Sequence, residues 1–350
     1  MGIFQSLIKK ETIHIVRDRR TMVVTLVMPL VLLLLFGFAI STQVNDIRLV
    51  AVVDRHTDYT RDILQRFQVN EYFTFQGLTA PDEAYSRLRS GRCDAALFLK
   101  HDGDTVKTQI ITDASNTNTA QATAMYVAGV MSDATSADMA LVQILYNPQM
   151  KSAYNFVPGI MGMIFILVCA IMTSVSIVRE KEQGTMNLLL VSPVRPHTII
   201  LGKLVPYFVL SCVILAVMLV VAYTVMGLPP SNGIFNVVVV SLLYIVLSLS
   251  IGLLVSTLVD SQLTALIVSA VIFMLPVIML SGMIYPISNM PALLQGISCI
   301  IPARWYIDAM RKLMIQQLDI SYIAADLAVL GVMTAVIIVV AIKKFNSDRT

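Results

Sequence analysis

Long uncharged apolar segments alternate with short charged ones along this chain. A transmembrane helix needs about 20 mostly apolar residues, and the pattern predicts six such helices. The segment 204–259 carries no charge and is too long for one helix, so the turn-rich sequence GLPPSNG at 227–233 divides it in two. We therefore expect an α-helical membrane protein with six transmembrane helices: a first span at 21–42, a second at 156–178, the third to fifth within 204–283, and a sixth at 322–342.

The first apolar segment follows basic residues, which is also the pattern of a secretory signal peptide. Residues 21–45 are all uncharged, however. That length is enough to cross a membrane and exceeds the apolar region of a typical signal peptide. We therefore expect a first span that is not cleaved.

The composition agrees with a membrane protein. Of the 350 residues 57% are hydrophobic and only 13% are charged, with a mean hydropathy of +0.77, whereas a soluble domain carries roughly 25% charged residues. The net charge of +3 gives no reason to expect nucleic-acid binding. The four cysteines and four histidines are scattered, so the sequence predicts neither a disulfide framework nor a metal site.

Basic residues are unevenly distributed among the segments that flank the spans. Twelve lie in the N-terminal segment, the 179–203 loop and the 343–350 tail, whereas the short loops of the opposite face hold three, Arg304, Arg311 and Lys312. The positive-inside rule therefore predicts that both termini and the 179–203 loop are cytoplasmic.

Residues 43–155 would then lie outside and form an inserted extracytoplasmic α/β domain. We see no cluster of catalytic residue types in it, and interpret its polar residues as a solvated surface. Alternating apolar patterns predict its strands and Pro and Gly signals bound its helices. We expect strands at 47–54, 71–77, 93–100 and 105–112, the last two as a hairpin around HDGD, and helices at 58–68, at 81–91 and after residue 119.

The segment 284–321 is too apolar for an ordinary loop and too interrupted by Pro286, Pro291 and Pro302 to span a membrane. Two short helices that dip into the outer leaflet would fit, and such a re-entrant segment could form an outer gate. An interfacial amphipathic hairpin anchored by Arg304, Trp305 and Tyr306 fits equally well.

The spans contain almost no ionisable side chains, which argues against an ion-driven carrier and against an intramembrane enzyme. The sequence also lacks G-x-x-x-x-G-K-[ST], so this chain is not expected to bind ATP through a P-loop. Any work it performs would draw on another polypeptide.

The charged loop 179–203 is long for a connector and too short for a domain. The sequence EKEQGTMNLLLVSP predicts one short amphipathic helix along the membrane, which Pro193 and Pro196 would end. Glu180 and Glu182 would lie near its start, where the helix dipole favours negative charge. Such a helix could transmit force from a cytoplasmic motor, or the loop could simply be a charged anchor.

The N-terminal segment 1–20 shows the pattern of an amphipathic interfacial helix. Glu11 and Asp18 project onto its apolar face, where lipid offers them no partner. A second protein would provide one.

At these residues the sequence resembles a known family, the type-two permeases of ATP-binding-cassette (ABC) exporters. The resemblance covers nearly the whole chain. It is most specific in REKEQGTMNLLLVSPVRPHTIILGK (179–203), which is similar to the family's coupling helix, and it extends to the N-terminal helix with the first span (9–40) and to the outer segment 280–311. The long insertion after the first span resembles the multidrug and sodium efflux subgroup.

The resemblance implies a non-catalytic permease subunit in a bacterial inner membrane. Two such chains, identical or homologous, would pair with two ATPase subunits that hold the ATP and Mg, and would export drug-like or lipid-like molecules. The substrate pathway would lie between the two copies. The residues it assigns to ATPase contact are Arg179, Glu180, Lys181, Glu182, Gly184 and Thr185, with Glu11, Arg17 and Asp18 as a second contact.

Flexible thioether surfaces suit varied apolar ligands, so six residues in and next to the second and fifth spans are candidates for the substrate path, although ordinary helix packing or lipid contact is the better-supported interpretation of them. They are Met161, Met163, Phe165, Met274, Met279 and Met283.

Three questions stay open at this stage. The substrate is not named by the sequence. The outer domain could bind substrate, an accessory periplasmic protein or only its twin. An ATP-driven sensor or mechanotransmission module, in which nothing crosses the membrane, is the alternative to an exporter.

Overall fold

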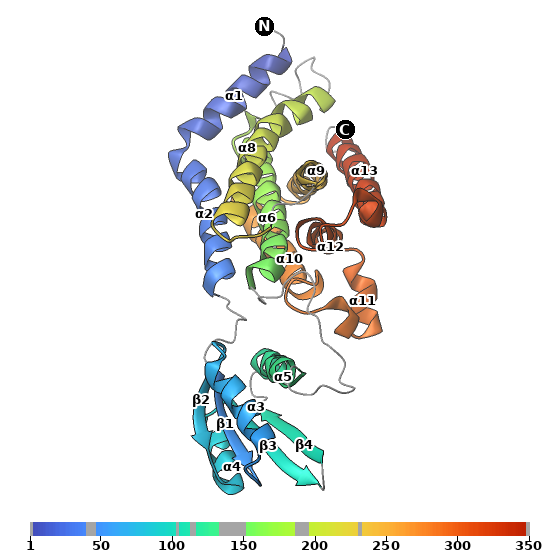
Figure 1. Cartoon of the computed structure of the whole chain (residues 1–350). Helices are drawn as coiled ribbons and strands as arrows, with labels where there is room; N and C mark the ends of the chain where they lie inside the picture. The colour runs from blue at the N-terminus through green and yellow to red at the C-terminus, as the bar shows by residue number, and fades with distance from the viewer. Residues whose placement is uncertain are drawn as a thin grey trace. The chain divides into compact units, whose positions relative to one another are not determined.

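The computed structural model describes residues 3–39, 47–102, 105–112, 117–132, 152–185, 196–229 and 233–347. The chain divides into two compact units, one formed by Met1–Ile40 with Ala153–Thr350 and the other by Ser41–Ser152 (Figure 1).

The described residues of the first unit form helices joined by turns, and no strand. Its α-helices are α1 (Ile3–Arg17), α2 (Arg19–Ala39), α6 (Ser152–Glu182), α8 (Pro196–Thr224), α9 (Ile234–Ser256), α10 (Gln262–Leu280), α11 (Ala292–Ser298), α12 (Pro302–Met314) and α13 (Ala324–Ser347), with 3₁₀ turns at Ile287–Asn289 and Ile320–Ile323.

Five described segments are long and apolar enough to cross a membrane. They are Phe156–Glu182, Thr198–Thr224, Ile234–Ser256, Gln262–Leu280 and Ile320–Lys344. These agree with five of the six predicted spans. The first predicted span falls on α2, where the described apolar stretch is the shorter Thr25–Leu35. That α2 crosses the membrane therefore stays a prediction.

Small residues allow the spans α6 and α9 to approach closely. A Cβ on Gly252 of α9 would lie 2.7 Å from the Ala170 carbonyl oxygen and 2.8 Å from the Thr173 Cβ, both on α6. Glycine at this position removes the side chain that would hold the two backbones apart, as is common between membrane helices.

Buried polar side chains join α6 to its neighbours. The Tyr244 hydroxyl of α9 donates to the Gly162 carbonyl of α6 at 3.0 Å, and the Tyr244 ring stacks on Tyr306 of α12 with centroids 4.2 Å apart. Ser174 bonds Ser269 of α10 at 3.1 Å. Hydrogen bonds of this kind hold helices together where the surroundings offer no competing water.

The segment 284–321 forms two short helices, as predicted. Its three prolines each start an element: Pro286 precedes the first 3₁₀ turn, Pro291 precedes α11, and Pro302 is the first residue of α12. One face of α12 is buried against α9 and α13. Arg304 lies 5.0 Å from the centroid of the Trp305 ring. The outer gate and the interfacial hairpin both stay predictions.

The second unit contains a four-stranded mixed sheet in the order β2-β1-β3-β4. β1 runs parallel to β2 and β3, and β3 pairs antiparallel with β4, which confirms the predicted hairpin. Helices α3 and α5 pack on one face of the sheet and α4 on the other. The bounds are β1 Ile47–Val53, β2 Phe73–Leu78, β3 Ala95–Asp102, β4 Thr105–Thr112, α3 Asp58–Val69, α4 Pro81–Arg89 and α5 Thr117–Ser132.

A bidentate ion pair joins the residue before β3 to strand β1. The Arg48 guanidinium donates to both Asp94 carboxylate oxygens, at 2.9 and 2.7 Å, and these hydrogen bonds hold the pKa of Asp94 below its usual value. Asp94 therefore stays ionised, and the pair intact, well into acidic conditions.

The close contact of α6 and α9 yields a stability prediction. Gly252→Ala should lower the free energy of unfolding by about 1–3 kcal/mol, since the added Cβ meets backbone that cannot move aside cheaply. The measurement is the apparent melting temperature of the purified chain in detergent. The matched control is Gly331→Ala in α13, where an added Cβ meets no atom within 4 Å. Equal melting temperatures for the two variants would contradict the proposed packing.

Candidate functional site

The last turn of α6 carries four consecutive charged residues, Arg179–Glu182, which we call the α6 terminal turn. Successive residues of a helix point about 100° apart, so four in a row face every side of the helix. The structure gives each of the four a partner on a neighbouring segment, and these segments are α1, α8 and the connection that leads from α9 into α10.

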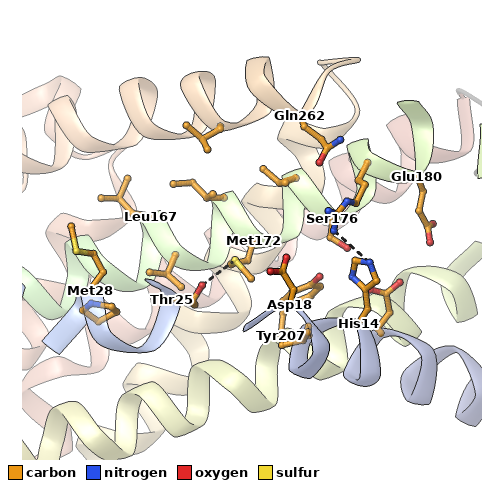
Figure 2. A pocket seen from close by; sticks show the side chains of 18 of the residues that line it. His14, Asp18, Thr25, Met28, Leu167, Met172, Ser176, Glu180, Tyr207 and Gln262 are labelled. Atoms are coloured by element: carbon orange, nitrogen blue, oxygen red, sulfur yellow. Dashed lines mark hydrogen bonds between the residues drawn. The ribbon is translucent and has the colours of Figure 1, made fainter. Parts of the chain in front are cut away.

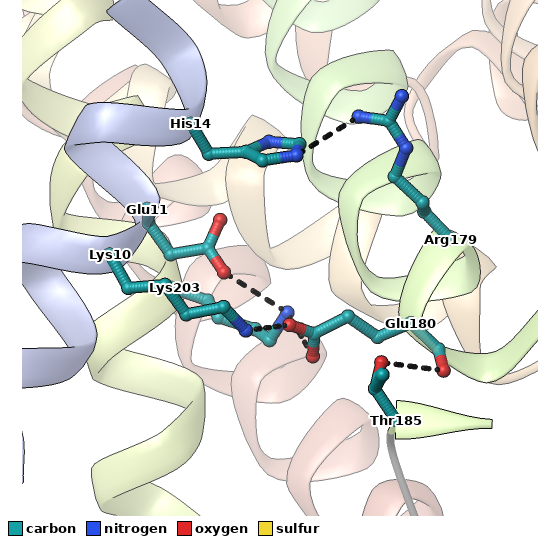
Figure 3. A network of polar contacts seen from close by, with 7 residues as sticks. All are labelled: Lys10, Glu11, His14, Arg179, Glu180, Thr185 and Lys203. Atoms are coloured by element: carbon teal, nitrogen blue, oxygen red, sulfur yellow. Dashed lines mark hydrogen bonds and ion pairs between the residues drawn. The ribbon is translucent and has the colours of Figure 1, made fainter. Parts of the chain in front are cut away.

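Glu180 lies in an ion cluster that joins three helices. Its carboxylate lies 2.6 Å from the Lys203 Nζ of α8 and 2.7 Å from the Lys10 Nζ of α1. The Lys203 Nζ also lies 3.5 Å from the Glu11 carboxylate of α1. Figure 3 shows Lys10 and Glu11 reaching from α1 toward Glu180 and Lys203. We call these four residues the ion cluster.

The ion cluster is buried at its centre. The exposed fraction of the side chain is 3% for Lys203, 6% for Glu11 and 10% for Glu180. Buried charges are tolerated when they are paired, and removing one partner leaves an uncompensated charge. Two lysines and two glutamates make this cluster neutral, so it can remain buried only as a complete set.

Arg179 makes a second link to α1. Its Nη1 lies 3.4 Å from the His14 Nε2. A guanidinium can only donate hydrogen bonds, so the His14 Nε2 accepts in this arrangement. The N-terminal helix is thus held to the α6 terminal turn at two neighbouring positions.

The other two residues of the turn contact the connection between α9 and α10. The Lys181 Nζ lies 3.3 Å from the Asp260 carboxylate and donates to the Val259 carbonyl at the same distance. The Glu182 carboxylate accepts from the backbone N–H of Gln262 at 2.9 Å and from its side-chain amide. Gln262 is the first residue of α10, so Glu182 supplies negative charge where the helix dipole favours it.

The structure corrects the helix predicted for this loop. Residues 180–182 do not start a separate coupling helix, because α6 continues without a break to Glu182. Gly184, at φ +71°, then ends the α6 turn in the left-handed conformation that glycine adopts most easily. Pro196 is the first residue of α8. Thr185 is helical and its hydroxyl donates to the Glu180 carbonyl at 3.3 Å. Residues 186–195, including Pro193, lie outside the described residues.

The structure places the three predicted contacts of the N-terminal helix in different surroundings. Glu11 is buried in the ion cluster, Asp18 is half-buried between α1 and α2, and Arg17 is exposed. The sequence correctly indicated that Glu11 needs a partner other than lipid, and the partner is Lys203 of the same chain. The ATPase contacts predicted for these residues and for the α6 terminal turn stay predictions.

The six candidate substrate-path residues divide into two groups. Met161, Met163, Phe165 and Met283 are buried inside the chain, where Met283 packs against Gly159. Met274 and Met279 are exposed on α10. Only these last two lie on a surface that a ligand or a second copy could reach in the structure as described.

Sequence reasoning missed Lys10 and Lys203. Lys203 had a signal: it is the last charge before the uncharged run 204–259, and an isolated cation at that point is expected to have an acidic partner. Nothing in the local sequence shows that this partner lies beside α1.

These features define a membrane protein in which apolar helices are joined to an N-terminal helix at one charged end. Comparison with known proteins gives the family. The profile of the ABC-2 family transporter proteins matches residues 19–343. The chain therefore belongs to the ABC-2 transporter family and is a multi-pass membrane permease of that type, as the sequence resemblance indicated.

Two relatives from Escherichia coli K12 are similar over most of their length. The chain is 29% identical to "Probable multidrug ABC transporter permease YbhS" over 329 residues, 88% of this chain and 87% of that protein. It is 27% identical to "Probable multidrug ABC transporter permease YbhR" over 350 residues, 94% of each chain. It is also 26% identical to ABC transporter G family member 20 of Dictyostelium discoideum over 196 residues, 56% of this chain and 27% of that protein.

The ion cluster yields a second prediction. Lys203→Met should lower the free energy of unfolding by about 3–5 kcal/mol, because two buried carboxylates lose their shared cation. The measurement is the apparent melting temperature in detergent. The matched control is Lys181→Met, whose partner Asp260 has a 97% exposed side chain, and which should cost at most about 1 kcal/mol. A Lys203→Met variant as stable as this control would contradict the cluster.

Proposed function

We propose that this chain is the permease subunit of an ATP-driven exporter for hydrophobic or amphipathic small molecules, drug-like or lipid-like. A separate ATPase subunit would bind ATP and Mg and contact the sequence segment 183–195. The chain itself would have no catalytic role. Both termini and this segment would face the cytoplasm of a bacterial cell, and the second unit would lie outside.

The observation that carries this proposal is the set of contacts made by the α6 terminal turn. Its four residues are bonded to α1, to α8 and to the connection between α9 and α10. A force applied to the loop that follows would therefore act on several spans together. A simple charged anchor has no need for a buried ion cluster, because exposed basic residues satisfy the positive-inside rule.

Pairing with a second permease copy is supported by the surface of α10. Several large apolar side chains of this helix are exposed in the single chain, including Leu263, Val271 and Leu275. In a bilayer such a face meets either lipid or another apolar helix. The predicted substrate path between two copies, with Met274 and Met279 on it, would use this face.

Coupling between ATP hydrolysis and transport provides the test. We expect the chain, purified from its native host in mild detergent, to carry a bound ATPase. Proteoliposomes of the complex should accumulate an amphipathic dye only when ATP is present. Glu180→Gln should keep the ATPase bound but lower ATP-dependent accumulation about tenfold, which corresponds to ~1.4 kcal/mol of lost coupling.

Glu71→Gln, the same chemical change at an exposed position of the second unit, is the control and should transport as the wild type does. Absence of any bound ATPase would overturn the proposal. ATP hydrolysis without dye accumulation would favour a sensor or mechanotransmission module instead of an exporter.

A further inference from the structure

A large cavity lies beside the α6 terminal turn within the single chain. Its volume is about 760 Å³, within the range of sites that hold drug-sized ligands. Figure 2 shows α6 along its middle, with α10 on one side and α1 and α2 on the other. The six residues that the sequence indicated for the substrate path do not line this cavity.

Most of the cavity wall is hydrocarbon. The apolar lining comes from α2, α6 and α10 and includes Leu32, Ile164, Leu167, Val168, Ile171 and Leu266. Met28 and Leu266 also line it and are about half exposed. Because they belong to helices of the membrane unit, an apolar chain can enter from the lipid side between them.

One end of the cavity is polar. The residues that line this end are His14 of α1, Asp18 between α1 and α2, Arg179 of α6, Gln183 directly after α6, and Gln262 of α10. From Ile164 to Val175 the part of α6 that lines the cavity is apolar, over about 16 Å at 1.5 Å per residue. A site that is apolar along this length and charged at one end has the shape and polarity of an amphiphile.

The charges at the polar end select the headgroup. Lys10, Glu11 and Glu180 also line the cavity, but with Lys203 they form the neutral ion cluster. Among the described residues, Arg179 has His14 as its polar partner, and the carboxylates of Glu11 and Glu180 beside it are paired with lysines instead. Its positive charge is therefore available to an anion, and a guanidinium binds phosphate and carboxylate through two parallel hydrogen bonds.

We propose that this cavity binds an amphiphile whose anionic headgroup, a phosphate or a carboxylate, pairs with Arg179 while its hydrocarbon chain lies along α6. This site goes beyond the proposed function, because binding requires neither the ATPase nor transport.

The test is photolabelling of the purified full chain without ATPase. The probe is a long-chain fatty acid with a diazirine near the end of its chain, and the comparison is an alkyl trimethylammonium of the same length and label. We expect the fatty acid to label, in a saturable manner, the residues of α6 and α2 that line the cavity. The cationic probe should reach half-saturation only at a concentration about tenfold or more above that of the fatty acid.

Variants separate the headgroup contact from the apolar site. Arg179→Gln should raise the half-saturating fatty-acid concentration about tenfold, as expected for one lost charge-assisted hydrogen bond, and Arg179→Lys should recover part of it. Ile171→Trp should reduce labelling by both probes, because it fills the cavity. Lys9→Gln, an exposed change on α1, should change neither. Each variant is first checked for an unchanged elution profile and melting temperature.

Labelling that does not saturate, that falls outside the cavity, or that is indifferent to both Arg179→Gln and Ile171→Trp would overturn the site. The source of the natural ligand is decided by extraction and mass spectrometry of the chain as purified. A co-purifying phospholipid that Arg179→Gln removes would identify a resident membrane lipid. If instead the wild-type chain is purified with no bound lipid, and the ATPase-bound complex moves fatty acid when ATP is added, the natural ligand is a transported amphiphile.

Discussion

A carboxylate buried between helices needs cations around it, and in this permease Glu180 receives them from two directions. Lys10 approaches from α1 and Lys203 from α8, with Glu11 balancing the second lysine. This requirement fixes where the N-terminal helix can lie against the membrane unit. The contacts of Arg179, Lys181 and Glu182 follow from it, because the same helical turn directs their side chains to the remaining neighbours. The charged end of the molecule is therefore one bonded assembly.

That assembly adjoins the two places where function is proposed. The sequence segment 183–195 follows it along the chain, and the amphiphile cavity begins beside it at Arg179. A ligand that pairs with Arg179 would compete with His14 for the guanidinium. Ligand binding and the position of α1 would then be linked. A bound ligand would favour an Arg179 that has left His14, whereas docked α1 favours the Arg179–His14 contact.

The sequence predicted the class of protein well and the charged site only in part. Uncharged runs such as 204–259 define spans because length and apolarity alone decide them, and the strand pattern of 93–112 was sufficient for a hairpin. The predicted start of the coupling helix was wrong, since a local pattern cannot show that α6 continues to Glu182 before Gly184 ends it. The partners of Glu180 could not be found either, because Lys10 is 170 positions away and only the tertiary fold brings the two together.

That separation along the chain has a consequence for how the protein is made. Lys10 and Glu11 are synthesised long before Glu180 and Lys203, and the whole second unit is made in between. During translation the N-terminal segments emerge first, so Lys10 can meet Glu180 only after α6 has been made, and Glu11 can meet Lys203 only after α8 has begun. Docking of α1 is therefore a late step of biogenesis, and it reports that the polypeptide has been threaded correctly through α6 and the start of α8.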